Sequence, residues 1–411
     1  MLDTYILNYL VIGLLLLLVT LGSSWITRLP FSYALIYLSV GIFLGPYGIH
    51  LIELRPQAEV LERLTEFAVL ISLFGCGLKM NRPFQFRAWN STIRLIGFLM
   101  PICIFALAAI GHLFLGLPWG SSILLGAILA PTDPVLASEI QMLDAQDRDE
   151  LRFGLTSEGG LNDALAFPFV YFGLYWMENP KWQDWFLHWV GIDVLWAIAA
   201  GIGMGLLVAN GVTWIHRRSQ RIKSTDELME DFIALSMVLI TYSLTELING
   251  YGFLAVFIAG IFVQRNQVTT ETYHSQREFA EKIEKLMEVG VILLLGSLLR
   301  IEPMIRFRGE MLLVAILLIF VIRPLGAWIS TAKSSLHPTR RLLYGWFGIR
   351  GLGSLYYLSY AFGKGLSGDI GEETAWIVYF TVIISIILHG ISATPLMTWY
   401  ENRLQKRKIV E

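Results

Sequence analysis

Five ionisable side chains interrupt long apolar stretches of this sequence: Asp133, Glu158, Asp163, Arg323 and Arg350. Each lies near the middle of a run long enough to cross the apolar core of a lipid bilayer. An ionised group there costs about 2.5–3.5 kcal/mol on insertion scales, so such residues pair with one another, contact water or carry function. A purely structural salt-bridge cluster is disfavoured, because three carboxylates face two guanidinium groups.

The third carboxylate leaves one negative charge without a partner. In low-dielectric surroundings an uncompensated carboxylate is neutralised by a proton, and a cation from solution has the same effect. A site that holds either a proton or a monovalent cation, but not both, is the minimum that cation/proton exchange requires. The charge balance therefore indicates exchange chemistry within the membrane.

The run around Asp133 reads Ala130-Pro131-Thr132-Asp133-Pro134. The two prolines remove two backbone donors and disfavour helical dihedral angles in the residues before them, so we expect the helix to break here. Within a bilayer such a break is tolerated only where the backbone lines a cavity. The freed carbonyls, the Thr132 hydroxyl and the Asp133 carboxylate are hard oxygen donors suited to Na⁺, K⁺ or Li⁺.

The next run carries Glu158 and, five residues later, Asp163. At about 100° per residue, Glu158 and Asn162 share one helix face, whereas Asp163 lies about 140° from Glu158 and beside Gly159 and Gly160. The glycines allow a neighbouring backbone, such as the preceding broken segment, to approach Asp163 closely. We expect Asp163 to carry the cation and the proton, and Glu158 to pair with an arginine.

Two arginines are available to Glu158, and the sequence does not choose between them. Arg323 lies in one run, directly before Pro324, and Arg350 lies in another beside Ser354. The arginine that does not pair with Glu158 is expected to neutralise the end of a broken helix. The run of Arg350 is loosened at mid-depth by four glycines, which are Gly345, Gly348, Gly351 and Gly353.

The elements that position these groups are apolar runs that we interpret as about 13 membrane spans. With 55% hydrophobic and 16% charged residues and a mean hydropathy of +0.59, the chain lacks the polar surface of a water-soluble protein. The net charge of −2 excludes a nucleic-acid binder on overall charge. The predicted spans are 5–27, 31–49, 59–79, 92–115, 119–141, 152–177, 188–215, 230–249, 251–264, 279–299, 309–331, 341–363 and 374–400.

The interrupted spans are the fifth and the twelfth. Because their offset is odd, they cross the membrane in opposite directions, and the chain divides into six spans, one linking span and six spans of inverted topology. Inverted repeats with discontinuous helices that meet at the midplane are typical of secondary transporters. The predicted fold is therefore an all-α polytopic membrane protein with a 6+1+6 repeat and two discontinuous crossing helices.

The loops differ in basic charge. About 22 Lys and Arg residues fall on one side against about six on the other, which places the N-terminus outside and the C-terminus in the cytoplasm. We expect a multi-pass protein of the cell (inner) membrane, in contact with the lipid bilayer, whose first span stays as a helix. Residues 401–411 are expected to form a short cytoplasmic tail.

Three further ionisable residues lie in or at the ends of spans. Glu66 and Glu246 are interpreted as solvated helix ends rather than as the lining of an access funnel. His389 is either a proton relay or a histidine that bonds a neighbouring helix. No nucleophile or metal motif supports an enzyme, and we expect no cofactor.

The segments Pro131-Thr132-Asp133-Pro134, Glu158-Gly-Gly-Leu-Asn162-Asp163 and Gly348-Ile-Arg350-Gly351 together resemble those of the monovalent cation:proton antiporter family, in its NhaP-like sodium/proton branch. The resemblance covers essentially the whole chain. It implies a homodimer with a transmembrane domain over residues 1–400. It also implies dimerisation helices over 5–79 and 188–299, and a mobile core over 92–177 and 309–400 that moves as an elevator.

The resemblance also implies roles for residues. Asp163 would bind the cation or proton, helped by Asp133 and Thr132, and the Asn162-Asp163 pair is associated with electroneutral one-for-one exchange. Relatives often have a serine directly after the glutamate, where this chain has Gly159. The Ser157 or Thr156 hydroxyl, or a water, is then expected to replace that oxygen, and the choice between Na⁺ and K⁺ stays open.

Overall fold

A computed structural model describes residues 6, 10, 13–14, 17, 32–52, 59–137, 140–142, 144–220, 227–266 and 270–410. The first predicted span, 5–27, lies almost wholly outside the described residues. Throughout the described part of the chain the regular structure is helical, with no strand. An all-α fold is thereby confirmed.

The α-helices of the described ranges keep the order of the predicted spans. They are α2 (Tyr33–Leu44), α3 (Glu59–Lys79), α4 (Asn90–Arg94), α5 (Met100–Leu113), α6 (Trp119–Leu129), α7 (Glu150–Leu165), α8 (Phe167–Glu178), α9 (Phe186–His188), α10 (Ala197–Gln220), α11 (Glu227–Leu247), α12 (Gly252–Arg265), α13 (Thr270–Ser297), α14 (Ile301–Arg306), α15 (Arg308–Leu317), α16 (Arg323–Ser330), α17 (Pro338–Trp346), α18 (Leu352–Gly363) and α19 (Gly368–Val410).

Three of the joints between these helices are π-helical. They are η1 (Leu95–Leu99) between α4 and α5, η4 (Trp189–Trp196) between α9 and α10, and η5 (Leu318–Ile322) between α15 and α16. One extra residue per turn changes which side chains face inward, and such segments occur often at functional sites.

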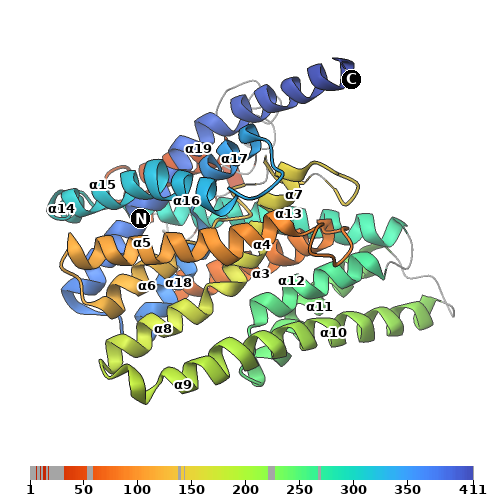
Figure 1. Ribbon diagram of the computed structural model, residues 1–411, viewed down its shortest axis with the longest axis horizontal. Helices are drawn as coiled ribbons and strands as arrows, with labels where there is room; N and C mark the ends of the chain where they lie inside the picture. Colours follow the sequence, from red (N-terminus) through yellow and green to blue (C-terminus); the bar gives the residue numbers. More distant parts are fainter. Residues whose placement is uncertain are drawn as a thin grey trace.

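Helix α3 lies at the centre of the molecule, where it packs against α7, α12, α13 and α18. Figure 1 shows α10 along one edge and α14 to α17 with α19 along the opposite edge. The short α12, which matches the ninth predicted span, is buried along most of its length between α3 and α10. It therefore packs against protein and not against lipid.

Four helical stretches are long and apolar enough to cross a bilayer by length and composition: Asn90–Leu113, Phe186–Ser219, Arg308–Ser330 and Gly368–Lys406. Their outward faces carry large apolar side chains. Phe98, Leu207 and Leu325 are each more than half exposed. Contiguous exposed apolar surface of this kind is stable only against lipid or another protein, as expected of an integral membrane protein.

Two spans are interrupted where the sequence predicts it. Helix α6 ends at Leu129, ahead of Pro131 and Pro134, and residues 130–133 are not helical. Helix α17 ends at Trp346 and α18 begins at Leu352. Both interruptions follow from local chemistry, since one contains two prolines and the other two glycines.

The end of the chain, predicted as a short tail, is helical as far as Val410. Helix α19 continues to Val410 without a break at residue 400. Glu401 forms an ion pair with Arg152 of α7, which ties this extension to the rest of the protein.

Gly77 of α3 and Gly260 of α12 form the closest approach at the centre. A Cβ atom on Gly77 would lie 2.9 Å from the Gly260 Cα, and one on Gly260 would lie 3.0 Å from the Gly77 Cα. We expect Gly77→Val to destabilise the protein by about 1–3 kcal/mol through overpacking. Thermal unfolding in detergent measures this effect. Gly203→Val is the matched control, because a Cβ there meets open space, and equal melting temperatures for both variants would contradict the packing.

Candidate cation-binding site

The two interrupted spans meet inside the protein. The backbone N–H of Asp133, in the break after α6, donates to the carbonyl of Ile349, in the break before α18, at 2.8 Å. The side chains of Asp133 and Arg350 are 2% exposed or less. This contact places the oxygen atoms of the break after α6 beside the N-terminus of α18.

Asp133 accepts hydrogen bonds from three backbone N–H groups. Its Oδ1 receives Val135 at 2.7 Å and Leu136 at 3.1 Å, and its Oδ2 receives Leu352, the first residue of α18. A carboxylate is stabilised at a helix N-terminus by the unpaired N–H groups and by the positive end of the helix dipole. Asp133 therefore holds both breaks in shape.

Arg350 occupies the opposite kind of helix end. Its Nη1 donates to the carbonyl of Pro131 at 3.0 Å, and Ser354 Oγ donates to the carbonyl of Ile128 at 2.8 Å. Ile128 belongs to the last turn of α6 and Pro131 follows the helix by two residues, so both carbonyls lie at its C-terminal end, where the helix dipole favours a cation. Each break thus receives the charge that it requires from the other break.

Glu158 is paired with Arg323 and not with Arg350. Two parallel hydrogen bonds of 2.7 and 2.9 Å join the guanidinium to the carboxylate, and Arg323 Nη2 also donates to the carbonyl of Phe347 at 2.8 Å. Both side chains are 3% exposed. A bidentate pair is the strongest arrangement that two such groups can form. The choice that the sequence leaves open is decided by this geometry.

Asp163 is the carboxylate without a partner. It is 1% exposed, and neither of its oxygens accepts a hydrogen bond from any described residue. Its backbone carbonyl accepts the hydroxyl of Tyr357, which holds the residue but leaves its charge uncompensated. Asp133 and Glu158, by contrast, are fully engaged. The surplus negative charge in the sequence therefore falls on Asp163.

Glycines of the second interrupted span make room for three of the charged side chains. A Cβ would overlap Arg323 at Gly348, Asp133 at Gly351 and Asp163 at Gly353. On the other side of Asp163, Gly159 lies against Pro134, where a Cβ would be 3.2 Å from the proline Cβ. At these glycines the backbone approaches its neighbours more closely than a residue with a side chain would permit.

Thr132 and Asn162 supply neutral oxygens. Asn162 Nδ2 donates to the Thr132 hydroxyl at 2.8 Å, while Asn162 Oδ1 is buried without a partner. Monovalent cations bind oxygen atoms whose lone pairs are free. The Asp163 carboxylate, Asn162 Oδ1 and Thr132 Oγ1 are the candidate ligands in this part of the structure.

Ser157 and Thr156 are engaged elsewhere. Ser157 Oγ lies 2.5 Å from Thr92 Oγ1 of α4 and donates to the carbonyl of Gly154. Thr156 Oγ1 bonds the carbonyl of Arg152 and the N–H of Met142. These contacts differ from the expectation that one of the two hydroxyls replaces the missing serine. Ser157 lies on a different helix face from Asp163, and Thr156 shares its face but lies two turns away, about 10 Å along the axis.

The remaining titratable residues of the sequence analysis have specific places. His389 bonds the carbonyls of Trp346 and Ser385 at 2.9 and 2.8 Å, so it is held against the break after α17. Glu66 and Glu246 line a cavity of about 1180 Å³. Glu246 is exposed at the end of α11, and Glu66 is partly buried near the start of α3, so both helix ends open into this cavity.

The structure buries three further carboxylates that were not among the five ionisable residues singled out in the sequence. Asp193 of η4 and Glu284 and Glu288 of α13 are buried as well. Glu288 forms an ion pair with Lys285 at 2.9 Å, and Ser72 Oγ donates to Glu284 at 3.4 Å. The signal was present in the sequence, since each residue interrupts a predicted span, but no proline or glycine marked the position.

Comparison with known proteins places these features in a family context. Residues 13–399 match the family described as sodium/hydrogen exchanger, transmembrane. The K(+)/H(+) antiporter NhaP of Alkalimonas amylolytica is 26% identical over 407 residues, which cover 97% of this chain and 68% of the relative. The K(+)/H(+) antiporter NhaP2 of Shewanella oneidensis is 25% identical over 400 residues, covering 94% and 66%. The chain thus spans about two thirds of the length of these relatives.

Other matches carry sodium in their names. A probable Na(+)/H(+) antiporter of Schizosaccharomyces pombe is 25% identical over 392 residues, which cover 86% of this chain and 51% of the relative. The solved structure of the sodium proton antiporter MjNhaP1 from Methanocaldococcus jannaschii has a TM-score of 0.74 at 22% identity, covering 96% of this chain and 98% of that one. This likeness shows that the two chains share a fold.

The two carboxylates of α7 are expected to respond oppositely to the same change. Glu158→Gln leaves Arg323 as an unpaired buried charge, which costs about 3–5 kcal/mol. Asp163→Asn removes a charge that has no partner, so stability should stay equal or rise. Melting temperatures of the two purified variants compare a carboxyl-to-amide change within one helix. A loss of stability in Asp163→Asn as large as that in Glu158→Gln would show that Asp163 is paired.

Proposed function

We propose that this chain, which belongs to the sodium/hydrogen exchanger family, exchanges a monovalent cation for a proton across a membrane. The observation that carries the proposal is the unpartnered Asp163 carboxylate. A buried carboxylate without a partner takes up a proton or binds a cation, and either one satisfies it. Competition between the two at one group couples their movements. The named relatives are antiporters, which are secondary transporters rather than enzymes.

The exchange is proposed to be electroneutral, with one cation for one proton. Asp133 and Arg350 compensate helix ends, and Glu158 and Arg323 compensate each other. Only Asp163 then changes its occupancy during the cycle. Because it carries one proton in one direction and one cation in the other, no net charge crosses the membrane.

We propose Na⁺ as the cation, with K⁺ as the alternative within the same mechanism. The ligands would be the carboxylate of Asp163, Oδ1 of Asn162 and Oγ1 of Thr132, with Asp133 contributing charge close by. Oxygen ligands of this kind accept both ions, and the names of the relatives include both. A cation channel is a weaker alternative, because a channel requires a continuous pore and Asp163 is enclosed.

Alternating access is proposed to occur by an elevator movement of a core against a scaffold. The core comprises residues 92–177 and 309–400, and the scaffold comprises residues 5–79 and 188–299 and forms a homodimer. Support comes from the position of Asp163 near the boundary, where Gly160 lies against Phe257 of α12. The two interrupted spans would be crossing helices of an inverted repeat, which such transporters place at the midplane.

The excess of basic residues on one side supports a proposed orientation with the N-terminus outside and the C-terminus in the cytoplasm. We place the protein in the cell (inner) membrane. In this orientation the 1180 Å³ cavity, which includes the end of α18 and the start of α3, faces outward.

Transport in proteoliposomes tests the proposed function. Addition of Na⁺ or K⁺ should dissipate an imposed pH gradient without generating a membrane potential, and Asp163→Asn should abolish the response. Asp184→Asn, an exposed aspartate, is the control for the loss of one negative charge. Cation flux that needs no proton, or normal exchange by Asp163→Asn, would refute the mechanism.

A second test changes the site without changing any charge. Gly353→Ala places a methyl group against the Asp163 carboxylate, so we expect at least about a tenfold loss of exchange rate, since an oxygen-ligand site tolerates little displacement. The control is Gly97→Ala, where a Cβ meets open space. Wild-type rates in both variants would mean that the cation does not approach Asp163 beside α18.

A further inference from the structure

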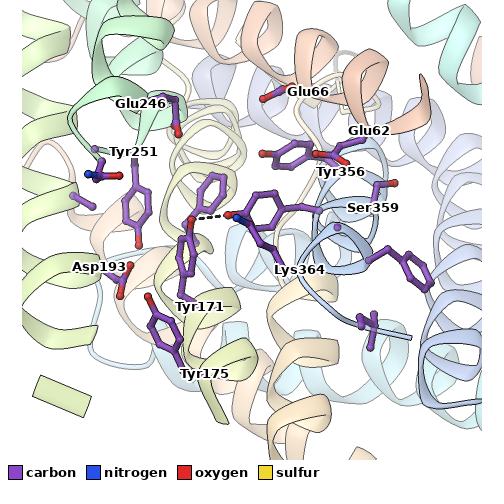
Figure 2. Close-up of a pocket in the computed structure, with 18 of the residues that line it drawn as sticks. Glu62, Glu66, Tyr171, Tyr175, Asp193, Glu246, Tyr251, Tyr356, Ser359 and Lys364 are labelled. Atoms are coloured by element: carbon purple, nitrogen blue, oxygen red, sulfur yellow. Dashed lines mark hydrogen bonds between the residues drawn. The ribbon is translucent and has the colours of Figure 1, made fainter. Parts of the chain in front are cut away.

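The cavity of about 1180 Å³ is lined mainly by α3, α8, η4, α11 and α18, and it holds more acidic than basic groups (Figure 2). Its carboxylates come from elements far apart in the sequence. Such a surface attracts cations and raises their local concentration. The charged residues of the lining are Glu59, Glu62, Glu66, Asp193 and Glu246 against Arg63 and Lys364, with His188 as a titratable neighbour.

Two of these carboxylates have partners within the cavity wall. Glu66 accepts the hydroxyl of Tyr242 and forms an ion pair with Arg63 at 3.1 Å. Glu246 Oε1 accepts the backbone N–H of Gly252 at 3.0 Å. Both residues therefore contribute to the structure of the wall.

Asp193 differs from them. Its side chain is 6% exposed, and its Oδ2 is buried without a hydrogen-bond partner among the described residues. Within Trp189–Trp196, Asp193 is the only buried residue, while its neighbours face outward in varying degree. The π-helical segment thus turns its one charged residue into the protein. A buried carboxylate oxygen without a donor is costly, and a bound ligand removes that cost.

Two tyrosine hydroxyls complete the surroundings of Asp193. Tyr175, which also lines the cavity, directs its hydroxyl toward Asp193 (Figure 2). Tyr251 is held nearby, because its N–H donates to the carbonyl of Ala197, one turn after Asp193, at 3.1 Å. The Tyr251 hydroxyl is itself buried without a partner. Figure 2 shows both rings directed toward Asp193.

We propose that Asp193, Tyr175 and Tyr251 bind a monovalent cation at a second site, separate from Asp163. One carboxylate and two neutral hydroxyls match a single positive charge, whereas divalent ions prefer several carboxylates. The unpaired Asp193 Oδ2 and Tyr251 hydroxyl are the atoms that the ion would satisfy. We infer the binding of the ion from this geometry alone. The role of the bound ion in transport rests on the proposed function.

Tyr175 of the second site lies on α8, the helix that follows Asp163 and α7. Tyr175 follows Asp163 by twelve residues along α7 and α8, a distance of about 18 Å at 1.5 Å per residue. Phe167, which lies between Asp163 and Tyr175 in the sequence, forms the floor of the cavity. Its ring centroid lies 5.2 Å from that of Tyr251 and 5.1 Å from that of Tyr357. In this conformation the aromatic floor separates the two sites. Under the proposed function, the second site would hold a cation before it reaches Asp163 or after it leaves.

Cation binding tests the site independently of transport. Purified Asp163→Asn protein should still bind radiolabelled Na⁺ or Rb⁺ in equilibrium dialysis. Asp163→Asn/Asp193→Asn should lose this binding, and Asp163→Asn/Asp184→Asn should keep it. Tyr251→Phe in the Asp163→Asn background removes only a hydroxyl and should weaken binding severalfold. Melting temperatures verify that each variant is folded.

Absence of residual binding in Asp163→Asn, or residual binding that Asp193→Asn leaves intact, overturns the second site. Transport supplies the other test. With Asp193→Asn, the KM for the cation on the cavity side should rise about tenfold, equivalent to ~1.4 kcal/mol, while the KM on the opposite side stays at its wild-type value. An equal change on both sides contradicts a site in this cavity.

The two proposals fail differently. If wild-type protein exchanges no cation for protons but Asp193-dependent binding persists, the proposed function is wrong and the second site stands. If exchange depends on Asp163 but neither binding nor the cavity-side KM depends on Asp193, the second site is wrong and the proposed function stands.

Discussion

Each of the two interrupted helices ends at a charged side chain that the other supplies, and the arrangement around Asp163 depends on this exchange. Asp133 accepts the first N–H of α18, and Arg350 donates to a carbonyl at the end of α6. Neither break is stable alone in a bilayer, because unpaired backbone groups there cost several kcal/mol each. The two breaks therefore form together, and they bring their open helix ends beside α7.

The two carboxylates of α7 have the same chemistry and differ in the groups that surround them. Glu158 and Asp163 are carboxylates of one helix, but only Glu158 lies where a guanidinium reaches it in bidentate geometry. Asp163 faces Gly353, and a glycine offers no side chain to satisfy it. Paired charges therefore surround one unpaired carboxylate, and the proposed exchange of ligands at Asp163 would leave those pairs unchanged.

The large cavity extends the same principle beyond the site. Its wall contains satisfied carboxylates, at Glu66 and Glu246, and one unsatisfied carboxylate, at Asp193. At both Asp163 and Asp193 a carboxylate oxygen is buried without a hydrogen-bond partner among the described residues. Such an oxygen is costly to leave unsatisfied, and the proposed cations would remove that cost.

The sequence by itself determined the all-helical membrane class, the two breaks and the identity of the charged residues around them. Prolines, glycines and charges in apolar runs have local costs that do not depend on the rest of the fold. Only the tertiary structure decided that Arg323 pairs with Glu158, that Ser157 bonds Thr92, and that Asp193 is buried. Pairing and burial depend on which helix faces lie within a few ångströms of one another, and helices distant in sequence decide this.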